Sequence, residues 1–152
     1  MFRNPVQGPR IVPFLQPRTT QDVLPNGHPG FRVTQRFGDR DAFGFPGIHG
    51  AMDIGNFWCG DKLLAMKYGT VQYLVDPNGA LGIQLTHRNG WKSQIWHLSR
   101  FRVADGSVVR RGKWIADVGS TGLDIGGCHA HVVAITPQGK HVDIWPLLDQ
   151  NQ

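Results

Sequence analysis

The chain of 152 residues is long enough for one domain with a hydrophobic core, and its 40% hydrophobic and 18% charged residues are typical of a folded protein. Lysine and arginine exceed aspartate and glutamate by 16 to 11, and the net charge of +5 favours an anionic partner such as nucleic acid, a lipid surface or an acidic cell-wall polymer. All 11 acidic residues are aspartates, so mechanisms that need a glutamate base are excluded.

The first segment, residues 1–30, is rich in proline and reads as an extended arm that precedes a domain at 31–152. It contains no apolar run long enough for a signal peptide or a membrane span, so we expect neither of them.

Short runs of alternating apolar and polar residues, separated by glycine and proline turns, predict β-strands along the rest of the chain. The first is expected at 31–37, and Asn89-Gly90 between two alternating runs predicts a hairpin. The other predicted strands lie at 52–54, 63–66, 69–75, 81–87, 91–97, 108–109, 114–118 and 132–135. No stretch has a sustained helical period, so the predicted fold class is mostly β.

Two histidines, at 129 and 131, stand just before the β-branched run of the last predicted strand. Because His129 and His131 are two apart, their side chains are expected on one face of the sheet. His49 and Asp53, four apart, would also share a face in an extended segment. An isolated pair of histidines is usually just polar strand residues, but two imidazoles and a carboxylate brought together would suit a catalytic zinc ion with one open position.

Five short motifs follow one another along the chain. They are His49-x-x-x-Asp53, Trp96-His97-Leu98-Ser99, the segment 105–112 (DGSVVRRG), Gly119-Ser120-Thr121-Gly122 and His129-x-His131. In order and spacing, from about residue 34 to 148, the chain resembles the lysostaphin-like (LytM-type) zinc endopeptidases of bacterial peptidoglycan. The resemblance implies a compact antiparallel β-sheet or half-barrel with long loops walling a zinc cleft. It also implies hydrolysis of peptide bonds in the stem peptide or cross-bridge of peptidoglycan.

The resemblance further implies a role for each matching residue. His49, Asp53 and His131 match the ligands of one zinc ion, and His97 and His129 match two catalytic histidines. An imidazole titrates near neutral pH, so histidines can do the proton transfer in a chain without glutamate. We assign His129 as the base and His97 as a partner that orients water or stabilises the developing oxyanion. The sequence leaves that division open.

Three residues are candidate substrate contacts: Trp58, in the loop after the predicted ligand Asp53, and the motif residues Trp96 and Thr121. The other tryptophans are expected to pack in the core or at its rim. Three histidines match no motif and are expected at the surface; they are His28, His87 and His141.

The two cysteines, Cys59 and Cys128, are too few for a disulfide framework. Cys128 lies beside His129, and three interpretations are open: a soft metal ligand, half of a disulfide, or a small packed residue. We favour the packed residue.

The expected partner is bacterial peptidoglycan. A wall hydrolase without an export signal fits a phage lysin or a component of the phage tail, located in the virion or released from the host cytoplasm. Other tail proteins would then dock on residues 1–30.

Three other functions have less support from the sequence. A non-catalytic structural or wall-binding protein with the same fold is the alternative. A lipoyl-type carrier lacks the lysine it requires at a hairpin tip, and no recognised nucleic-acid motif accompanies the positive charge, so neither is expected.

Overall fold

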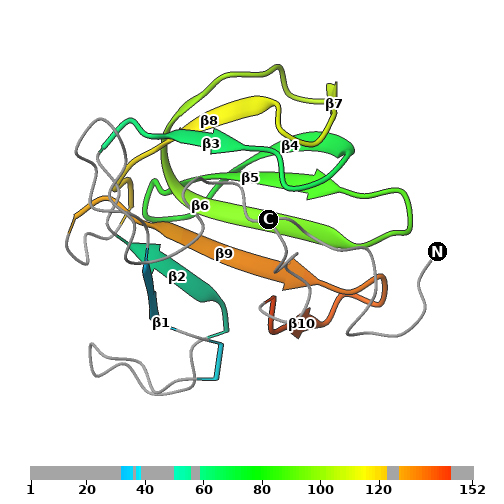
Figure 1. Cartoon of the computed structure of the whole chain (residues 1–152), viewed down its shortest axis with the longest axis horizontal. Coiled ribbons are helices and arrows are strands. Elements are labelled where there is room, and N and C mark those ends of the chain that lie inside the picture. Colours follow the sequence, from blue (N-terminus) through cyan, green and yellow to red (C-terminus); the bar gives the residue numbers. More distant parts are fainter. Residues whose placement is uncertain (1–31, 36, 39–49, 56–58, 123–126, 145–152) are drawn as a thin grey trace.

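The structure, a computed structural model, describes residues 32–35, 37–38, 50–55, 59–122 and 127–144, and its strands form one sheet (Figure 1). In chain order they are β1 (Arg32–Gln35), β2 (Met52–Gly55), β3 (Lys62–Leu64), β4 (Gly69–Val75), β5 (Leu81–Thr86), β6 (Lys92–Phe101), β7 (Val108–Val109), β8 (Trp114–Val118), β9 (Ala130–Ile135) and β10 (His141–Val142). The described residues contain no helix, so the expected mostly β fold is confirmed. Accordingly, no described helix is of the length and apolarity that a membrane crossing needs.

The strand order is β1-β2-β9-β6-β5-β4-β7, with β10 beside β9 and β8 between β6 and β3. Every pairing is antiparallel. In Figure 1, β3 and β8 lie at one side of the molecule and β1 and β2 at the other. The two motif-bearing strands β6 and β9 are direct neighbours near the middle of this order, so residues 35 positions apart in the sequence meet there.

The predicted bounds of β4, β7 and β8 agree with the structure. β6 runs four residues beyond its predicted end at His97, because after that point it changes partner and pairs with β8. The short strand β10 was not predicted, since it owes its extended form to pairing with the end of β9.

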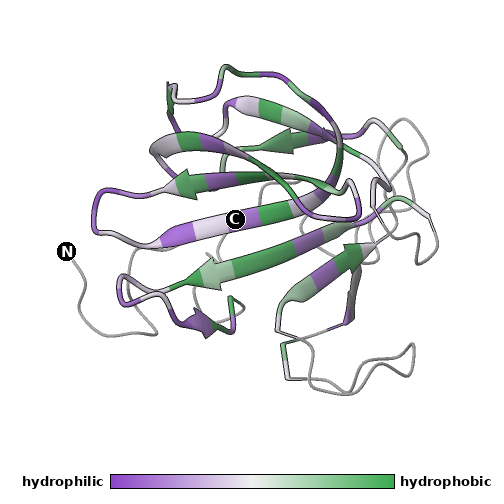
Figure 2. Ribbon diagram, turned by 180° about the vertical axis from the view of Figure 1, so that it is seen from behind, coloured by the Kyte–Doolittle hydropathy of each residue, from purple (hydrophilic) through white to green (hydrophobic). Residues whose placement is uncertain are grey.

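The two faces of the sheet differ along neighbouring rows. The row Met52, Val132 and Ile95 is at most 1% exposed and belongs to the main hydrophobic core. The adjacent row, one residue away on each strand, is Asp53, His131 and Trp96. Figure 2 shows this alternation as hydrophobic and hydrophilic bands along the strands. The polar row therefore lies on the face opposite the core.

His87 is buried, which corrects the expectation that it lies at the surface. Only 2% of it is exposed, and both ring nitrogens have partners: the Tyr68 carbonyl at 2.8 Å from Nδ1 and the Ser93 hydroxyl at 3.0 Å from Nε2. These two hydrogen bonds offset the cost of removing a polar ring from water. His141 is exposed as expected, and His28 lies outside the described residues.

Candidate metal centre and catalytic histidines

Asp53 and His131 form the centre of the candidate site. They are directly opposite each other on β2 and β9, and Nδ1 of His131 lies 2.9 Å from Oδ1 of Asp53. The Asp53 carboxylate is nearly buried, with 8% of its side chain exposed, whereas 28% of the His131 side chain is exposed. A carboxylate and an imidazole 78 positions apart in the chain are thus brought together by strand pairing alone.

His97 reaches the same face through an irregularity in β6. Leu81 pairs with Leu98 and Gly82 pairs with Trp96, so His97 is the extra residue of a β-bulge. It is the one non-glycine residue with positive φ, at 69°, in the part of the chain that the structure describes. The bulge interrupts the alternation, since Ile95 and Leu98, three apart, both face the core.

The distances between the histidine rings show where the bulge places the His97 side chain. The His97 ring lies 4.6 Å from the His129 ring and 5.8 Å from the His131 ring, measured between centroids. In a regular strand His97 would point to the core face, opposite to Trp96. The bulge therefore turns the His97 imidazole toward the other two histidines.

A backbone carbonyl sets the tautomer of His97. Nδ1 of His97 lies 2.8 Å from the Thr121 carbonyl oxygen, which only accepts hydrogen bonds, so Nδ1 carries the proton. In the neutral ring, Nε2 then has a free lone pair. Burial lowers the pKa of His97 below its ordinary 6.5, with the nearby His129 and His131 acting in the same direction and the Thr121 and Asp53 oxygens opposing it.

His129 has a similar arrangement. It stands just before β9 and is half-buried, and its Nδ1 lies 3.2 Å from the Gly127 carbonyl. Its Nε2 is buried and has no hydrogen-bond partner among the described residues. A buried nitrogen without a partner is costly, and its presence is typical of a position where a ligand or water completes the hydrogen bonding.

Two of the predicted site residues, His49 and Trp58, lie outside the described residues. Within the described ranges no group of three histidine, cysteine or acidic side chains suits a metal ion. The Asp53 and His131 pair nevertheless fits part of a zinc site. A carboxylate oxygen and an imidazole nitrogen are both atoms that zinc binds, and Oδ1 and Nδ1 already lie together, at a hydrogen-bond distance of 2.9 Å.

Trp96 lies beside His131 in the register and is fixed by neighbours that the sequence analysis missed. Its indole N–H donates to Gln94, whose amide donates to Gln84, whose amide donates to Gln72. The ring also covers Gly82, where a Cβ would come within 2.6 Å of it. Glutamines at paired positions of three neighbouring strands are the sequence signal for this chain of hydrogen bonds. Substrate contact by Trp96 stays a prediction.

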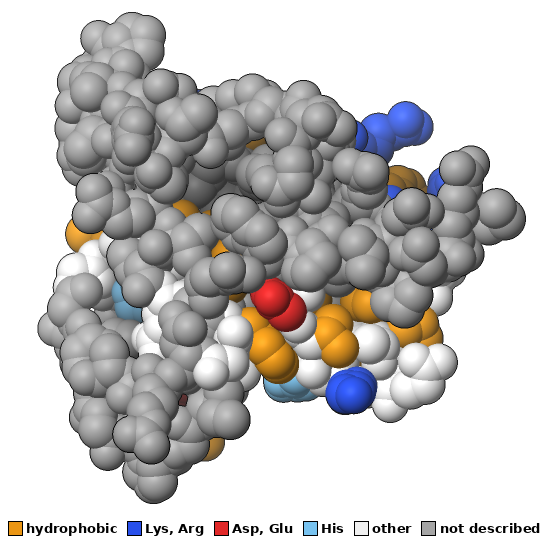
Figure 3. Space-filling view, turned by 60° about the horizontal axis from the view of Figure 1, so that its bottom comes forward, with side chains coloured by type: hydrophobic (Ala, Val, Ile, Leu, Met, Phe, Trp, Pro, Cys, Tyr) orange, Lys and Arg blue, Asp and Glu red, His pale blue; other side chains and the backbone are white. Residues whose placement is uncertain are grey.

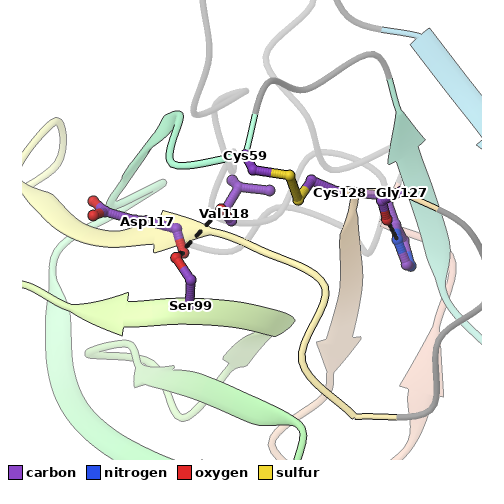
Figure 4. The surroundings of a disulfide bond; sticks show 7 residues. Cys59, Ser99, Asp117, Val118, Gly127 and Cys128 are labelled. Atoms are coloured by element: carbon purple, nitrogen blue, oxygen red, sulfur yellow. Dashed lines mark hydrogen bonds between the residues drawn. A yellow bond between two sulfur atoms is a disulfide. The ribbon is translucent and has the colours of Figure 1, made fainter.

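Cys59 and Cys128 form a disulfide, with their Cα atoms 5.3 Å apart (Figure 4). The favoured interpretation of Cys128 as a free packed residue was wrong, and a disulfide sulfur is also not a thiolate metal ligand. The bond joins the segment before His129 to the segment before β3, where Gly60 donates to the Val118 carbonyl at 2.8 Å. It thereby ties the start of β9 to the end of β8.

Charged side chains are not gathered on the described surface in Figure 3. There, hydrophobic, acidic, basic and histidine side chains are interspersed. One arginine, Arg102, binds Asp117 through bonds of 2.7 to 3.1 Å and lies 4.2 Å from the Trp114 ring. It serves the fold, so that it contributes less to an anion-binding surface than its charge suggests.

The chain is similar to known proteins over the region that contains these residues. The model of peptidase family M23 matches residues 47–144. The comparison with curated proteins finds no match.

Three solved structures have the same fold. LytU is 27% identical, with a TM-score of 0.67 over 77% of this chain and 83% of that one. The catalytic domain of lysostaphin from Staphylococcus simulans is 22% identical, with a TM-score of 0.66 over 76% of this chain and 90% of that one. A zinc-containing peptidase from Vibrio cholerae is 24% identical, with a TM-score of 0.64 over 74% of this chain; the match spans about a third (35%) of that longer chain. The antiparallel sheet is thus the lysostaphin-like fold.

Proposed function

Because the chain belongs to peptidase family M23 and is a metalloendopeptidase, we propose that it hydrolyses peptide bonds in bacterial peptidoglycan with a zinc ion held by His49, Asp53 and His131. The observation that carries the proposal is the meeting of the Asp53 and His131 pair with the rings of His97 and His129 on one face of the sheet. The net charge of +5 is also compatible with an acidic wall polymer.

A zinc ion bound by these residues would polarise the scissile carbonyl and make the attacking water more acidic. The chain's own contribution is the placement of two imidazoles whose Nδ1 atoms are held by backbone carbonyls. We assign proton acceptance to His129, because its buried Nε2 has no partner among the described residues.

His97 has a different assigned role. In the neutral form its Nε2 accepts a hydrogen bond and so orients water. The alternative role, stabilising negative charge on the substrate oxygen, would need a proton on Nε2, so that this nitrogen donates. Trp96 would form a wall of the cleft beside His131, and Trp58 is proposed as a further wall.

The test is incubation of the purified protein with purified peptidoglycan from a panel of bacterial walls, with new amino groups as the measurement. We expect new amino groups that disappear with chelator, return with added zinc, and are absent in Asp53→Asn. Asp76→Asn is the matched control, since Asp76 lies in the turn after β4, where an asparagine Oδ1 can still accept from the Asn78 and Ala80 amides.

The same experiment separates the non-catalytic alternative, a structural or wall-binding protein. Such a protein would bind walls in a sedimentation assay and release no amino groups from any wall, with zinc or without it. That result would contradict the proposed function.

We also propose a narrower setting, a phage lysin or tail-mounted component whose residues 1–30 dock on a neighbouring tail protein. This setting stays a prediction. Deletion of residues 1–30 is expected to abolish assembly while the isolated domain still cleaves walls. If the shortened chain joins the same assemblies as the full chain, the docking role is wrong.

A further inference from the structure

The loop after β8 meets the bulge of β6 through Thr121, a residue expected to contact substrate. Its hydroxyl donates to the Leu98 carbonyl at 2.6 Å and accepts from the Leu81 amide at 3.0 Å. Leu81 and Leu98 are paired across β5 and β6 at the irregularity itself. The hydroxyl therefore links the two strands where the bulge disturbs their ladder, and its only proton is already used within the protein.

The same residue holds His97 with its main chain. The Thr121 carbonyl accepts from Nδ1 of His97 at 2.8 Å. Thr121 thus makes two kinds of contact with this part of β6: the hydroxyl reaches the residue after His97, and the carbonyl reaches the His97 ring. The loop position is restricted further by Gly122, with φ +95°, where a Cβ would come within 2.6 Å of the Ala80 Cβ.

We propose that Thr121 is a positioning residue for His97, in that its hydroxyl anchors the carbonyl that selects the Nδ1–H tautomer and the orientation of the imidazole. A residue with positive φ at a bulge is strained and keeps its conformation only when neighbours hold it. The hydroxyl of Thr121 is one such neighbour. This inference rests on the proposed role of His97, and it replaces substrate binding as the role of Thr121.

The first measurement uses the zinc-loaded wild-type protein with ¹⁵N-labelled histidine. The NMR shifts of its ring nitrogens report which one carries the proton, and the His97 signals are assigned by their loss in His97→Ala. We expect the proton on Nδ1. A proton on Nε2 in the neutral ring would overturn the proposal, whether or not any variant folds.

The second measurement compares variants. Thr121→Val removes the hydroxyl at nearly constant volume, Thr121→Ala serves in its place if the valine variant does not fold, and Thr121→Ser keeps the hydroxyl. We expect Thr121→Val to bind zinc like the wild type, to lose the uniform Nδ1–H state of His97, and to lose kcat by roughly 10- to 100-fold with KM unchanged. Thr121→Ser is expected to restore both readouts.

The matched control is Thr136→Val. Thr136 follows β9 at the end away from His131, and its hydroxyl accepts from the Lys140 amide at 3.1 Å. This variant should change neither readout. A rise in KM with unchanged His97 signals in Thr121→Val would assign Thr121 to substrate contact instead, and an unchanged kcat with unchanged signals would also refute the positioning role. If the wild type cleaves no wall at all, the proposed function fails, while the NMR result still decides the role of Thr121 on its own.

Discussion

Two histidines of the β5–β6 hairpin illustrate the difference between a structural and a functional imidazole. His87, after β5, is 2% exposed and has partners on both ring nitrogens. His97, on β6, is half-buried, and among the described residues only its Nδ1 has a hydrogen bond. Its ring also lies near the rings of His129 and His131. A histidine with one nitrogen fixed and other imidazoles nearby is suited to chemistry, whereas a doubly satisfied one stabilises the fold.

The largest expected effect comes from His97→Ala. Loss of the imidazole is predicted to lower kcat for peptidoglycan cleavage by roughly 10²- to 10³-fold, because a preorganised hydrogen-bonding group is removed from the reaction. Zinc content and thermal unfolding should change little, since the ring is only half-buried. His141→Ala, at an exposed position, is the control. An unchanged kcat in His97→Ala would contradict the assignment of His97 as a functional imidazole.

The disulfide lies next to the histidine cluster, because Cys128 directly precedes His129. The double variant Cys59→Ser/Cys128→Ser is expected to lower the free energy of unfolding by about 2–4 kcal/mol, because the bond closes a loop of 69 residues. Hydrogen exchange should increase at the start of β9, next to His129, more than around His87. Equal increases at both places would show that the bond stabilises the fold as a whole and does not act on the site.

The substitution His87→Gln tests whether His87 stabilises the fold. It removes the partner of the Ser93 hydroxyl or of the Tyr68 carbonyl, and a buried group without a partner costs roughly 1–3 kcal/mol. The loss is measured by urea unfolding. The folded variant should keep its kcat. A large loss of kcat with unchanged stability would contradict the assignment of His87 to the fold.

The smallest effect is a pH dependence. Burial lowers the pKa of His87 below its ordinary 6.5, so the unfolded chain takes up a proton at a higher pH than the folded chain does. The stability from neutral His87 is therefore complete above pH 6.5 and is lost as the pH falls through the lower folded pKa. The hydrogen bond from Arg102 lowers the pKa of Asp117 below 3.8, so that contribution is lost only in stronger acid. The free energy of unfolding in urea is measured at pH 5 and at pH 7.5. Its change between the two pH values should be smaller in His87→Gln than in the wild type, and equal changes would contradict this account.

Much of the fold could be predicted from local sequence. Alternation marks the first half of β4, where buried and exposed residues alternate from Gly69 to Gln72, and the Asn89-Gly90 turn marks the hairpin of β5 and β6. Alternation does not predict β10, which is two residues long and depends on its partner β9. The disulfide between residues 69 positions apart likewise follows from the fold and from no local pattern.

The candidate site was only partly predictable. The spacing of His129 and His131 predicts that both lie near one face of the sheet, and the rings of both lie near the His97 ring, whereas the position of His97 depends on a bulge that exists only in the paired sheet. The hydroxyl contacts of Thr121 are also long-range and leave no mark in the sequence. Burial of His87 was missed because one histidine in an alternating run has no signal of its own.

The most direct test of the central claim is the zinc content of purified wild-type protein, His131→Ala and His141→Ala, measured by atomic emission after dialysis against trace zinc. We predict one zinc ion per chain in the wild type and in His141→Ala, and none in His131→Ala, whose missing imidazole is the partner of the Asp53 carboxylate. Wild-type protein without zinc, or His131→Ala with a full complement of zinc, would contradict the assignment of this site as the metal centre.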